Sequence, residues 1–419
     1  MQRPNHPRFW RHQECQHSQY FFCGTGSNSL DYDSANYSEG QLISTLARNH
    51  LGVEFDDWLI ADGPGSGNQQ ENDKWTLPGN YTDARGTTFG SGWEENVKHA
   101  IAVIKKDPSH MRTLMTDAEI RILQREKSAA EAAGLEPQNT FGGWTPANKH
   151  RKIVPQALQK ARAKVLRTPL PDRVNLIGWS RGAVTCHMMA NAMYADPQLR
   201  HICVNIFAID PVPGPLNFQL NRTTLNTNVL EYRAVYARDE RARGFTPIIP
   251  DVKVKKELIL MPGAHATLVG NASKNGKGGG NQIFPEPGQM VRHLAETFLR
   301  DNGTQLGSCL NLKDTGLLEL YEQILKDDRS YIAMRQLGYG MGCVETESGD
   351  RWAAVGSGAV VAGLTSLPML HPDPIFVNWH HRSVYIKHYA DLTGRPEAIE
   401  RDLLAQWFPV TTGRFISRP

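Results

Sequence analysis

Cysteine is scarce in this sequence, and the few cysteines present are irregularly spaced. The chain of 419 residues has six of them and contains no C-x-x-C pair. A disulfide framework or a zinc site needs cysteines at close and regular spacing, so both are disfavoured. We expect the six thiols to be buried or free: Cys15, Cys23, Cys186, Cys203, Cys309 and Cys343.

Long hydrophobic runs are also missing. Residues 1–18 are polar and rich in His, Arg and Gln, without an apolar core of the kind a Sec signal peptide has, so we expect synthesis in the cytoplasm without such a signal. The longest uncharged stretch, residues 352–372, is long enough to cross a bilayer but is broken by Gly and Pro and only weakly hydrophobic. Two interpretations stay open for it: a packed Gly/Ala segment, which is the more common use of apolar residues, or a lipid-facing flap.

A strong charge of either sign is lacking too. The formal net charge is +3 and no basic run stands out, which disfavours nucleic-acid binding. Hydrophobic residues make up 40% of the chain and charged residues 21%, as in a globular protein with an ample core. One elaborated α/β domain can account for most of this length.

Short apolar runs and amphipathic segments alternate along the chain. Strands are predicted at residues 20–23, 57–61, 174–177, 202–209, 229–237 and 256–261. Helices are predicted at residues 38–48, 93–105, 117–133, 155–166, 183–194, 287–299, 317–325 and 396–408. This order predicts a mostly parallel sheet flanked by helices, the α/β class.

The most informative motif is GWSRG at residues 178–182, which stands between a predicted strand and a predicted helix. In that context G-x-S-x-G indicates a nucleophile elbow, a tight turn that presents a serine. The glycines are needed because the strand and the helix pass too close for a Cβ. Ser180 is therefore the predicted nucleophile. The alternative is an ordinary turn carrying a surface serine.

Two further residues complete a set with Ser180. Asp210 and His265 each follow a predicted strand, and the order Ser-Asp-His is that of the α/β-hydrolase sheet. The imidazole would take the serine proton, and the carboxylate would fix the imidazole tautomer and stabilise its charged form. Asp239, in the charged segment 238–245, is the alternative acid.

The residues predicted to stabilise the developing oxyanion are Arg181, Thr25 and Gly26. Arg181 begins the predicted helix, and the loop GTGSN at residues 24–28 follows a buried strand and can turn its N–H groups toward an oxyanion. A phosphate loop is excluded because no Gly-Lys-Ser/Thr follows, and a simple turn remains the alternative.

The remaining histidines do not predict a metal site or a cofactor. His187 is expected to pack inside the fold or lie on the surface, and His380 and His381 have no acidic partner at ligand spacing. No metal ligands are predicted, although the sequence leaves a calcium dependence open.

Five short motifs in order resemble a large bacterial and fungal family of α/β-hydrolases that includes type VI secretion phospholipase effectors. They lie at residues 23–27 (CGTGS), 64–67 (PGSG), 178–183 (GWSRGA), 239–247 (DERARGFTP) and 262–267 (PGAHAT). The resemblance covers residues 18–300 and departs from the family pattern at Cys23 and Thr267, where the family has acidic residues. The turn IDPV at 209–212 resembles both the family's F-D-T-V turn and the acid turn of pancreatic-type lipases, which favours Asp210 over Asp239.

These observations predict an α/β-hydrolase catalytic domain at residues 18–300, with an insertion at 106–150 that is a candidate cap. Residues 301–419 would form a helical or irregular extension that covers the site, forms a membrane-binding surface or docks a delivery protein. The predicted activity is a serine lipase that cleaves carboxylic esters through an acyl-enzyme. The resemblance implies phospholipid substrates, export by a type VI system, a secretion-apparatus partner and an immunity protein. The alternatives are a housekeeping esterase, thioesterase or peptide hydrolase, and an inactive hydrolase fold used for binding.

Overall fold

The computed structural model describes a large part of the chain. The described residues are 16–54, 56–66, 92–107, 170–254, 256–274, 283–344, 351–355 and 364–366. Most of the predicted insertion lies outside the described residues, as do the helices predicted at 117–133, 155–166 and 396–408.

The centre of the fold is a six-stranded sheet in the order β2-β1-β3-β4-β5-β7, and every neighbouring pair is parallel. The strands are β1 (His17–Phe22), β2 (Trp58–Ala61), β3 (Arg173–Trp179), β4 (Cys203–Ile209), β5 (Val229–Ala237) and β7 (Lys256–Met261). This confirms the predicted α/β class. Nearly continuous apolar runs such as β4 suit a strand that is covered on both faces of a parallel sheet.

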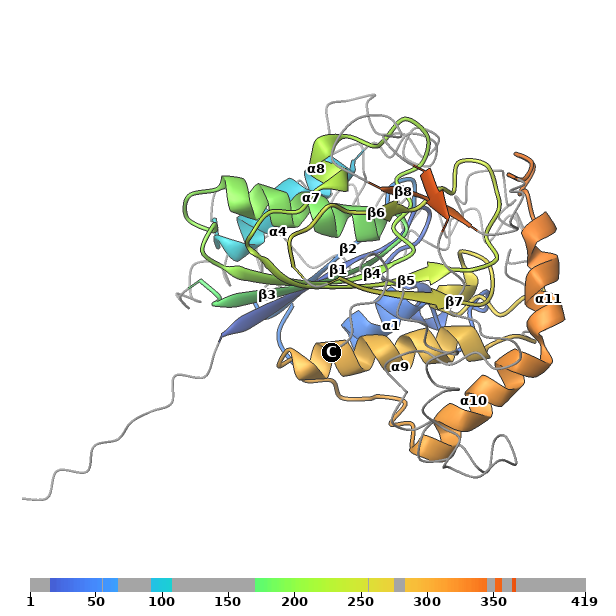
Figure 1. Cartoon of the computed structure of the whole chain (residues 1–419). Helices are drawn as coiled ribbons and strands as arrows, with labels where there is room; N and C mark the ends of the chain where they lie inside the picture. Colours follow the sequence, from blue (N-terminus) through green and yellow to red (C-terminus); the bar gives the residue numbers. More distant parts are fainter. Residues whose placement is uncertain are drawn as a thin grey trace, which may run out of the picture.

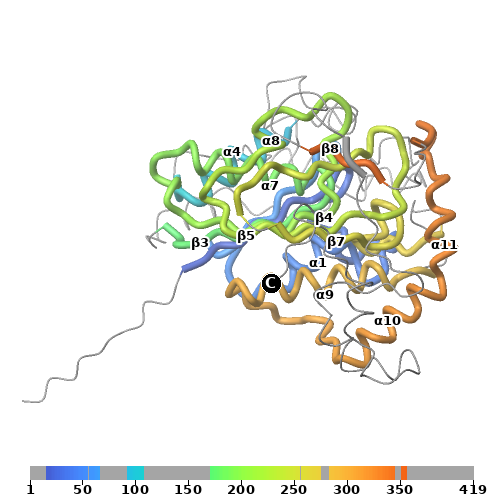
Figure 2. Tube along the Cα trace, viewed as in Figure 1, coloured from blue at the N-terminus to red at the C-terminus, as the bar shows by residue number. Residues whose placement is uncertain are grey.

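Helices cover both faces of this sheet (Figure 1). One face carries α4 (Trp93–Ile104), α7 (Arg181–Ala195) and the short α8 (Leu220–Thr223). The other face carries α1 (Leu42–Arg48) and α9 (Glu286–Asp301). Each helix layer buries its own apolar cluster against the sheet, so the hydrophobic core has two parts, one on each face of the sheet. The same layers can be followed along the chain in Figure 2.

The predicted elements match the observed ones closely, except that one helix begins later than predicted. β5 and β7 have the predicted bounds, and the other strands differ at their ends by at most three residues, the largest difference being the start of β1. The helix predicted from residue 38 begins at Leu42, because the Gln41 side chain accepts the Ser44 N–H at 3.0 Å and caps it.

A second, smaller sheet was not predicted. It contains β6 (Ile248–Ile249), β8 (Trp352–Val355) and β9 (Leu364–Ser366), with β6 and β8 parallel and β8 and β9 antiparallel. Two of its strands come from the uncharged stretch at 352–372. Ala353 is fully buried in the core cluster under α7, so this part of the stretch is packed, as the first of the two interpretations expected.

The described part of the C-terminal extension packs onto the sheet domain. It includes α10 (Asp314–Lys326) and α11 (Asp328–Ala333), which follow α9 along one side of the molecule (Figure 1). Leu317, Tyr321, Ile324 and Tyr331 are buried in the same cluster as α9. The predicted helix at 317–325 is thus confirmed, within a longer α10.

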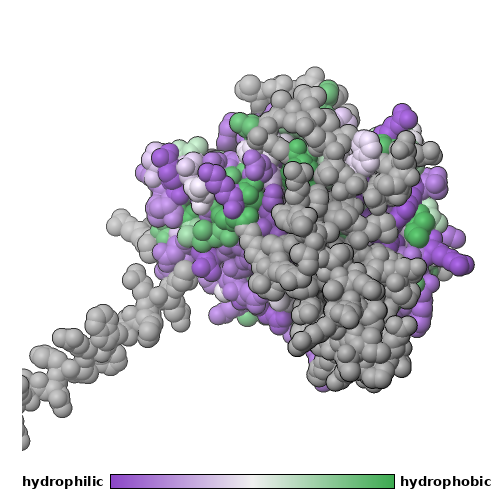
Figure 3. Space-filling view, in the orientation of Figure 1, coloured by the Kyte–Doolittle hydropathy of each residue, from purple (hydrophilic) through white to green (hydrophobic). Residues whose placement is uncertain are grey.

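The described surface has few marked features. Where Figure 3 colours the described residues, they are largely hydrophilic with smaller apolar patches. The helices that the structure describes include none with the length and apolar character needed to cross a membrane. The five described cysteines form no disulfide with one another, and Cys23 and Cys186 are buried.

Candidate active site

The GWSRG motif forms a strained turn between β3 and α7. Ser180 has φ 58° and ψ −127°, a region that non-glycine residues rarely occupy and that costs about 1–3 kcal/mol. The flanking glycines are required by contact. A Cβ on Gly182 would lie 2.1 Å from the Phe22 carbonyl oxygen, and one on Gly178 would lie 2.4 Å from the Gly182 carbonyl carbon. The sequence therefore holds Ser180 in a fixed, unusual conformation beside the N-terminus of α7.

Asp210 lies beside this turn because β4 pairs with β3. Trp179 and Ile209 are register partners, and the Ser180 N–H donates to the Ile209 carbonyl at 2.9 Å. Asp210 also has a positive φ, 42°, as the chain turns sharply at the end of β4. Its side chain is completely buried and accepts the Ala237 N–H at 3.2 Å.

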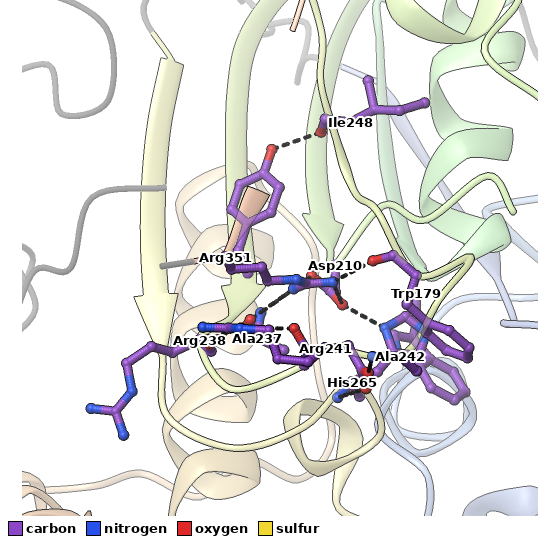
Figure 4. Close-up of polar contacts among 12 residues, drawn as sticks. Trp179, Asp210, Ala237, Arg238, Arg241, Ala242, Ile248, His265 and Arg351 are labelled. Carbon is purple, nitrogen blue, oxygen red and sulfur yellow. Dashed lines mark hydrogen bonds and ion pairs between the residues drawn. The ribbon is translucent and has the colours of Figure 1, made fainter. Parts of the chain in front are cut away.

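His265 approaches Asp210 from the loop that follows β7. Its Nδ1 lies 2.5 Å from Asp210 Oδ2 (Figure 4). Its ring centroid lies 5.0 Å from those of Trp179 and Phe245. The His265 N–H donates to Glu240 Oε2 at 3.1 Å, and its carbonyl accepts Trp179 Nε1–H at 3.3 Å. A carboxylate can only accept, so Nδ1 carries the proton and leaves Nε2 able to accept one.

Ser180 and His265 lie at the same edge of the sheet, both almost fully buried, at 6% and 5% exposure. Within the described residues no hydrogen bond joins the Ser180 hydroxyl to the imidazole. Such contacts are often long in free enzymes and tighten when substrate binds. The structure thus brings the three residues together but shows a hydrogen bond only between the acid and the base.

The charge of Asp210 is balanced by an arginine that sequence analysis did not single out. Arg351 donates to both carboxylate oxygens of Asp210, with Nη2 to Oδ2 at 3.0 Å. Burial favours the neutral acid, but the Arg351 charge and the His265 hydrogen bond outweigh it and hold the pKa of Asp210 below its usual value. Asp210 is therefore ionised at neutral pH.

The alternative acid, Asp239, is occupied elsewhere. It is fully buried and accepts the Gly263 N–H at 2.9 Å, Arg238 Nε–H at 3.0 Å and Arg335 Nε–H at 2.8 Å. None of these contacts involves His265. Asp239 instead ties the loop after β5 to the turn after β7, which is a scaffolding role.

The predicted oxyanion residues lie together, but their amides are used differently. The Gly26 N–H donates to the Pro64 carbonyl at 3.0 Å, whereas the Thr25 N–H donates to no other described residue. The Arg181 side chain reaches Thr25 Oγ1 at 3.0 Å and the Pro213 carbonyl at 3.0 Å. It therefore connects the first loop to the loop after Asp210. Burial, with a smaller effect of Arg222, lowers the pKa of Arg181 to about 10, so it stays charged at neutral pH.

The other histidines considered in the sequence do not add a metal centre in the described part of the chain. His187 is fully buried on α7, with Nδ1 2.8 Å from the Arg222 carbonyl and Nε2 3.1 Å from the Tyr232 hydroxyl, so it packs inside the fold rather than lying on the surface. No group of three or more His, Cys, Asp or Glu side chains in the described ranges is arranged to hold a metal ion. His380 and His381 lie outside those ranges.

Comparison with known proteins gives only distant likenesses. No protein-family model matches the chain, and a search of curated proteins finds no match. One similar solved structure is an uncharacterized protein from Pseudomonas aeruginosa, at 13% identity and a TM-score of 0.36, covering 77% of this chain and 51% of that one. Another is the Tle1 effector bound to the VgrG spike of the Type 6 secretion system, at 14% identity and a TM-score of 0.30, covering 61% of this chain and 50% of that one. The chain spans about half the length of either structure. At these TM-scores the likeness assigns no function.

Proposed function

We propose that this protein is a serine ester hydrolase in which Ser180 is the nucleophile, His265 the general base and Asp210 the acid that orients it. The observation that carries the proposal is the 2.5 Å contact between Asp210 and His265, beside a serine held in a strained elbow. Buried, mutually fixed groups of this kind match the requirement of nucleophilic catalysis for a serine, a base and an orienting acid.

The proposed reaction is acyl transfer in two stages. The Ser180 oxygen attacks the ester carbonyl carbon while His265 Nε2 takes the hydroxyl proton, and His265 then gives that proton to the departing alcohol. Water next attacks the acyl-enzyme by the same route and releases the carboxylic acid. The N–H groups of Thr25 and Arg181 would hold the oxyanion, each contributing about 3–4 kcal/mol to lowering the barrier.

The substrate class we propose is the carboxylic esters of lipids, phospholipids in particular. This narrower step is supported by the sequence motifs and their resemblance to the phospholipase effector family. On the same ground we propose delivery by a type VI secretion system, with a secretion-apparatus partner and a neutralising immunity protein.

The test compares wild type with Ser180→Ala on phospholipid vesicles and on a soluble short-chain ester, following the released acid and alcohol. Ser308→Ala, at an exposed position, is the matched control. We expect wild type and Ser308→Ala to prefer vesicles and Ser180→Ala to lose both activities. Cleavage of the soluble ester alone would replace the lipase proposal with a general esterase. Activity unaffected by Ser180→Ala would contradict the assigned nucleophile, and inactivity of all three proteins would favour a binding role.

A further inference from the structure

The residue that balances Asp210 comes from outside the predicted catalytic domain. Arg351 directly precedes β8, in the extension that begins at residue 301, and lies 141 positions from Asp210. It is 4% exposed. In Figure 4 Asp210 lies between the Arg351 guanidinium and the His265 ring. The C-terminal extension therefore supplies a direct contact to the proposed acid.

The backbone around Arg351 is held close to the acid turn. β8 pairs with β6 through Ile248 and Ala354, and the Ala354 N–H donates to the Pro247 carbonyl at 2.8 Å. The Ile248 N–H in turn donates to the carbonyl of Pro211, the residue after Asp210, at 2.8 Å. The small sheet is thus hydrogen-bonded to the turn that carries Asp210.

The guanidinium of Arg351 makes hydrogen bonds to Asp210 and to two backbone carbonyls beside it. Besides Asp210, it donates to the Ala237 carbonyl at 2.7 Å and to the Phe245 carbonyl at 2.8 Å. Asp210 accepts the Ala237 N–H, so Asp210 and Arg351 bind the N–H and the carbonyl of the same residue. The planar fork of an arginine can make such a set of contacts, whereas the point charge of a lysine cannot.

Arg351 also reaches the surroundings of the base. The Phe245 whose carbonyl it binds has its ring edge-on to His265, with the centroids 5.0 Å apart. The segment that precedes Arg351 is anchored to the same loop. The Arg243 N–H donates to the Gly342 carbonyl at 3.0 Å, and the Val344 N–H donates to the Arg241 carbonyl at 2.7 Å. Displacing Arg351 would therefore disturb both the acid and the aromatic wall of the base.

We propose that Arg351 is a positioning residue of the active site, which keeps Asp210 ionised and aligned on His265, and that the C-terminal extension is for this reason a necessary part of the catalytic unit. This rests on the proposed function for its catalytic consequence. The alignment of Asp210 and His265 can be measured without any substrate, so the two proposals can fail separately.

The pH behaviour of Asp210 gives a specific readout. The titratable and charged groups around it are His265, Arg351, Tyr236 of β5 and Tyr339 after η4 (Met334–Gln336), with Glu240 and Arg241 in the adjoining loop. Arg351 makes the bidentate contact with the carboxylate, and its charge lowers the pKa of Asp210. Removing a neighbouring opposite charge raises the pKa of a carboxyl. The acid limb of kcat/KM should move to higher pH accordingly.

The test uses full-length Arg351→Ala, Arg351→Lys and the control Arg335→Met, which removes a guanidinium of the same extension that binds Asp239 instead. We expect Arg351→Ala to lose about 10²-fold in kcat/KM, as for a misaligned catalytic group, with the acid limb displaced. Added guanidinium ion should restore activity to Arg351→Ala, whereas sodium chloride or urea should not. Arg351→Lys should recover the pH profile more than the rate, and Arg335→Met should keep the wild-type profile per folded molecule.

A second readout is the low-field proton NMR signal of His265 Nδ1–H, which reports its hydrogen bond to Asp210. We expect this signal in wild type and Arg335→Met, its loss in Arg351→Ala, and its return with guanidinium ion. An unchanged signal and an unchanged acid limb in Arg351→Ala would overturn the proposal. If wild type cleaves no ester yet the signal behaves as expected, the positioning role stands and the proposed function fails.

Discussion

Asp210 and Asp239 show how partners, rather than burial, separate two carboxylates. Both are completely buried, and both are paired with arginine. Only Asp210 touches His265, whereas Asp239 accepts from Arg238, Arg335 and a backbone N–H. The first arrangement serves an imidazole that must become charged, and the second holds a loop.

Substituting the two aspartates by asparagine should therefore have different consequences. Asp210→Asn should lower kcat/KM by a factor on the order of 10⁴, because the amide no longer fixes the imidazole tautomer. Asp239→Asn should instead lower stability by about 3–5 kcal/mol, since it removes the charge of a buried carboxylate that pairs with Arg238 and Arg335. Ester hydrolysis per folded molecule and urea unfolding distinguish them. Loss of activity confined to Asp239→Asn would exchange the two roles.

Residues that follow a strand were accessible to sequence analysis, but Arg351 was not. Ser180 and Asp210 stand directly after an apolar run and His265 follows one after a short turn, which places all three at one edge of a parallel sheet. Arg351 follows the polar run ETESGD and meets its partner 141 positions away. No local pattern encodes such a contact. The hydrogen bond from the Gly26 N–H to the Pro64 carbonyl could not be predicted either, because it forms only where two loops meet in the fold.

At the scale of elements, the elbow requires both of its glycines for contact reasons. The strand that enters and the helix that leaves are so close that a methyl group on Gly182 would overlap the backbone of β1. Backbone atoms cannot move aside as a flexible side chain can, so the whole junction of β1, β3 and α7 would have to shift.

Gly182→Ala should accordingly destabilise the protein by about 3 kcal/mol or more, the upper part of the range for overpacking. The matched control is Gly316→Ala in α10, where the nearest atom to an added Cβ is a leucine methyl at 3.5 Å. That change should stabilise the helix by about 0.5–1 kcal/mol. Thermal unfolding of the two variants beside wild type measures both effects. A Gly182→Ala protein as stable as wild type would show that the junction is looser than described.

The strands of the small sheet could not be predicted from the sequence. β6 has two residues, and β8 and β9 lie in a Gly-rich apolar stretch without alternation. Their strand conformation comes from pairing with one another and, for β6, from hydrogen bonding to the Pro211 carbonyl. Tertiary contacts determine the conformation of such short segments, whereas the long apolar strands of the main sheet can be predicted from their own sequence.

At the scale of the whole molecule, stability should depend on pH through His187, which joins α7, α8 and β5. Burial lowers the pKa of His187 from 6.5 to about 4, so the folded protein binds this proton less readily than the unfolded chain. Its contribution is complete above about pH 6.5 and is lost as the pH falls toward 4. It amounts to at most about 3 kcal/mol.

His187→Gln tests this dependence, because an amide can still donate to the Arg222 carbonyl and accept from Tyr232 without titrating. The free energy of unfolding, measured with urea from pH 7 to pH 4, should fall more steeply in wild type than in the variant. Parallel curves would mean that His187 does not govern acid sensitivity. The depressed pKa of Asp210 acts in the same direction, as its stabilising charge is lost on acidification.

The most direct measurement is covalent labelling of the intact protein with a fluorophosphonate, followed by mapping of the modified peptide. A serine activated by His265 and Asp210 should be phosphonylated once, at Ser180, and the label should disappear in Ser180→Ala and fall sharply in His265→Gln. The strained elbow, the acid–base pair and the oxyanion amides all predict that single adduct. Absence of labelling in folded wild type, or labelling that His265→Gln leaves unchanged, would contradict a catalytic serine at this site.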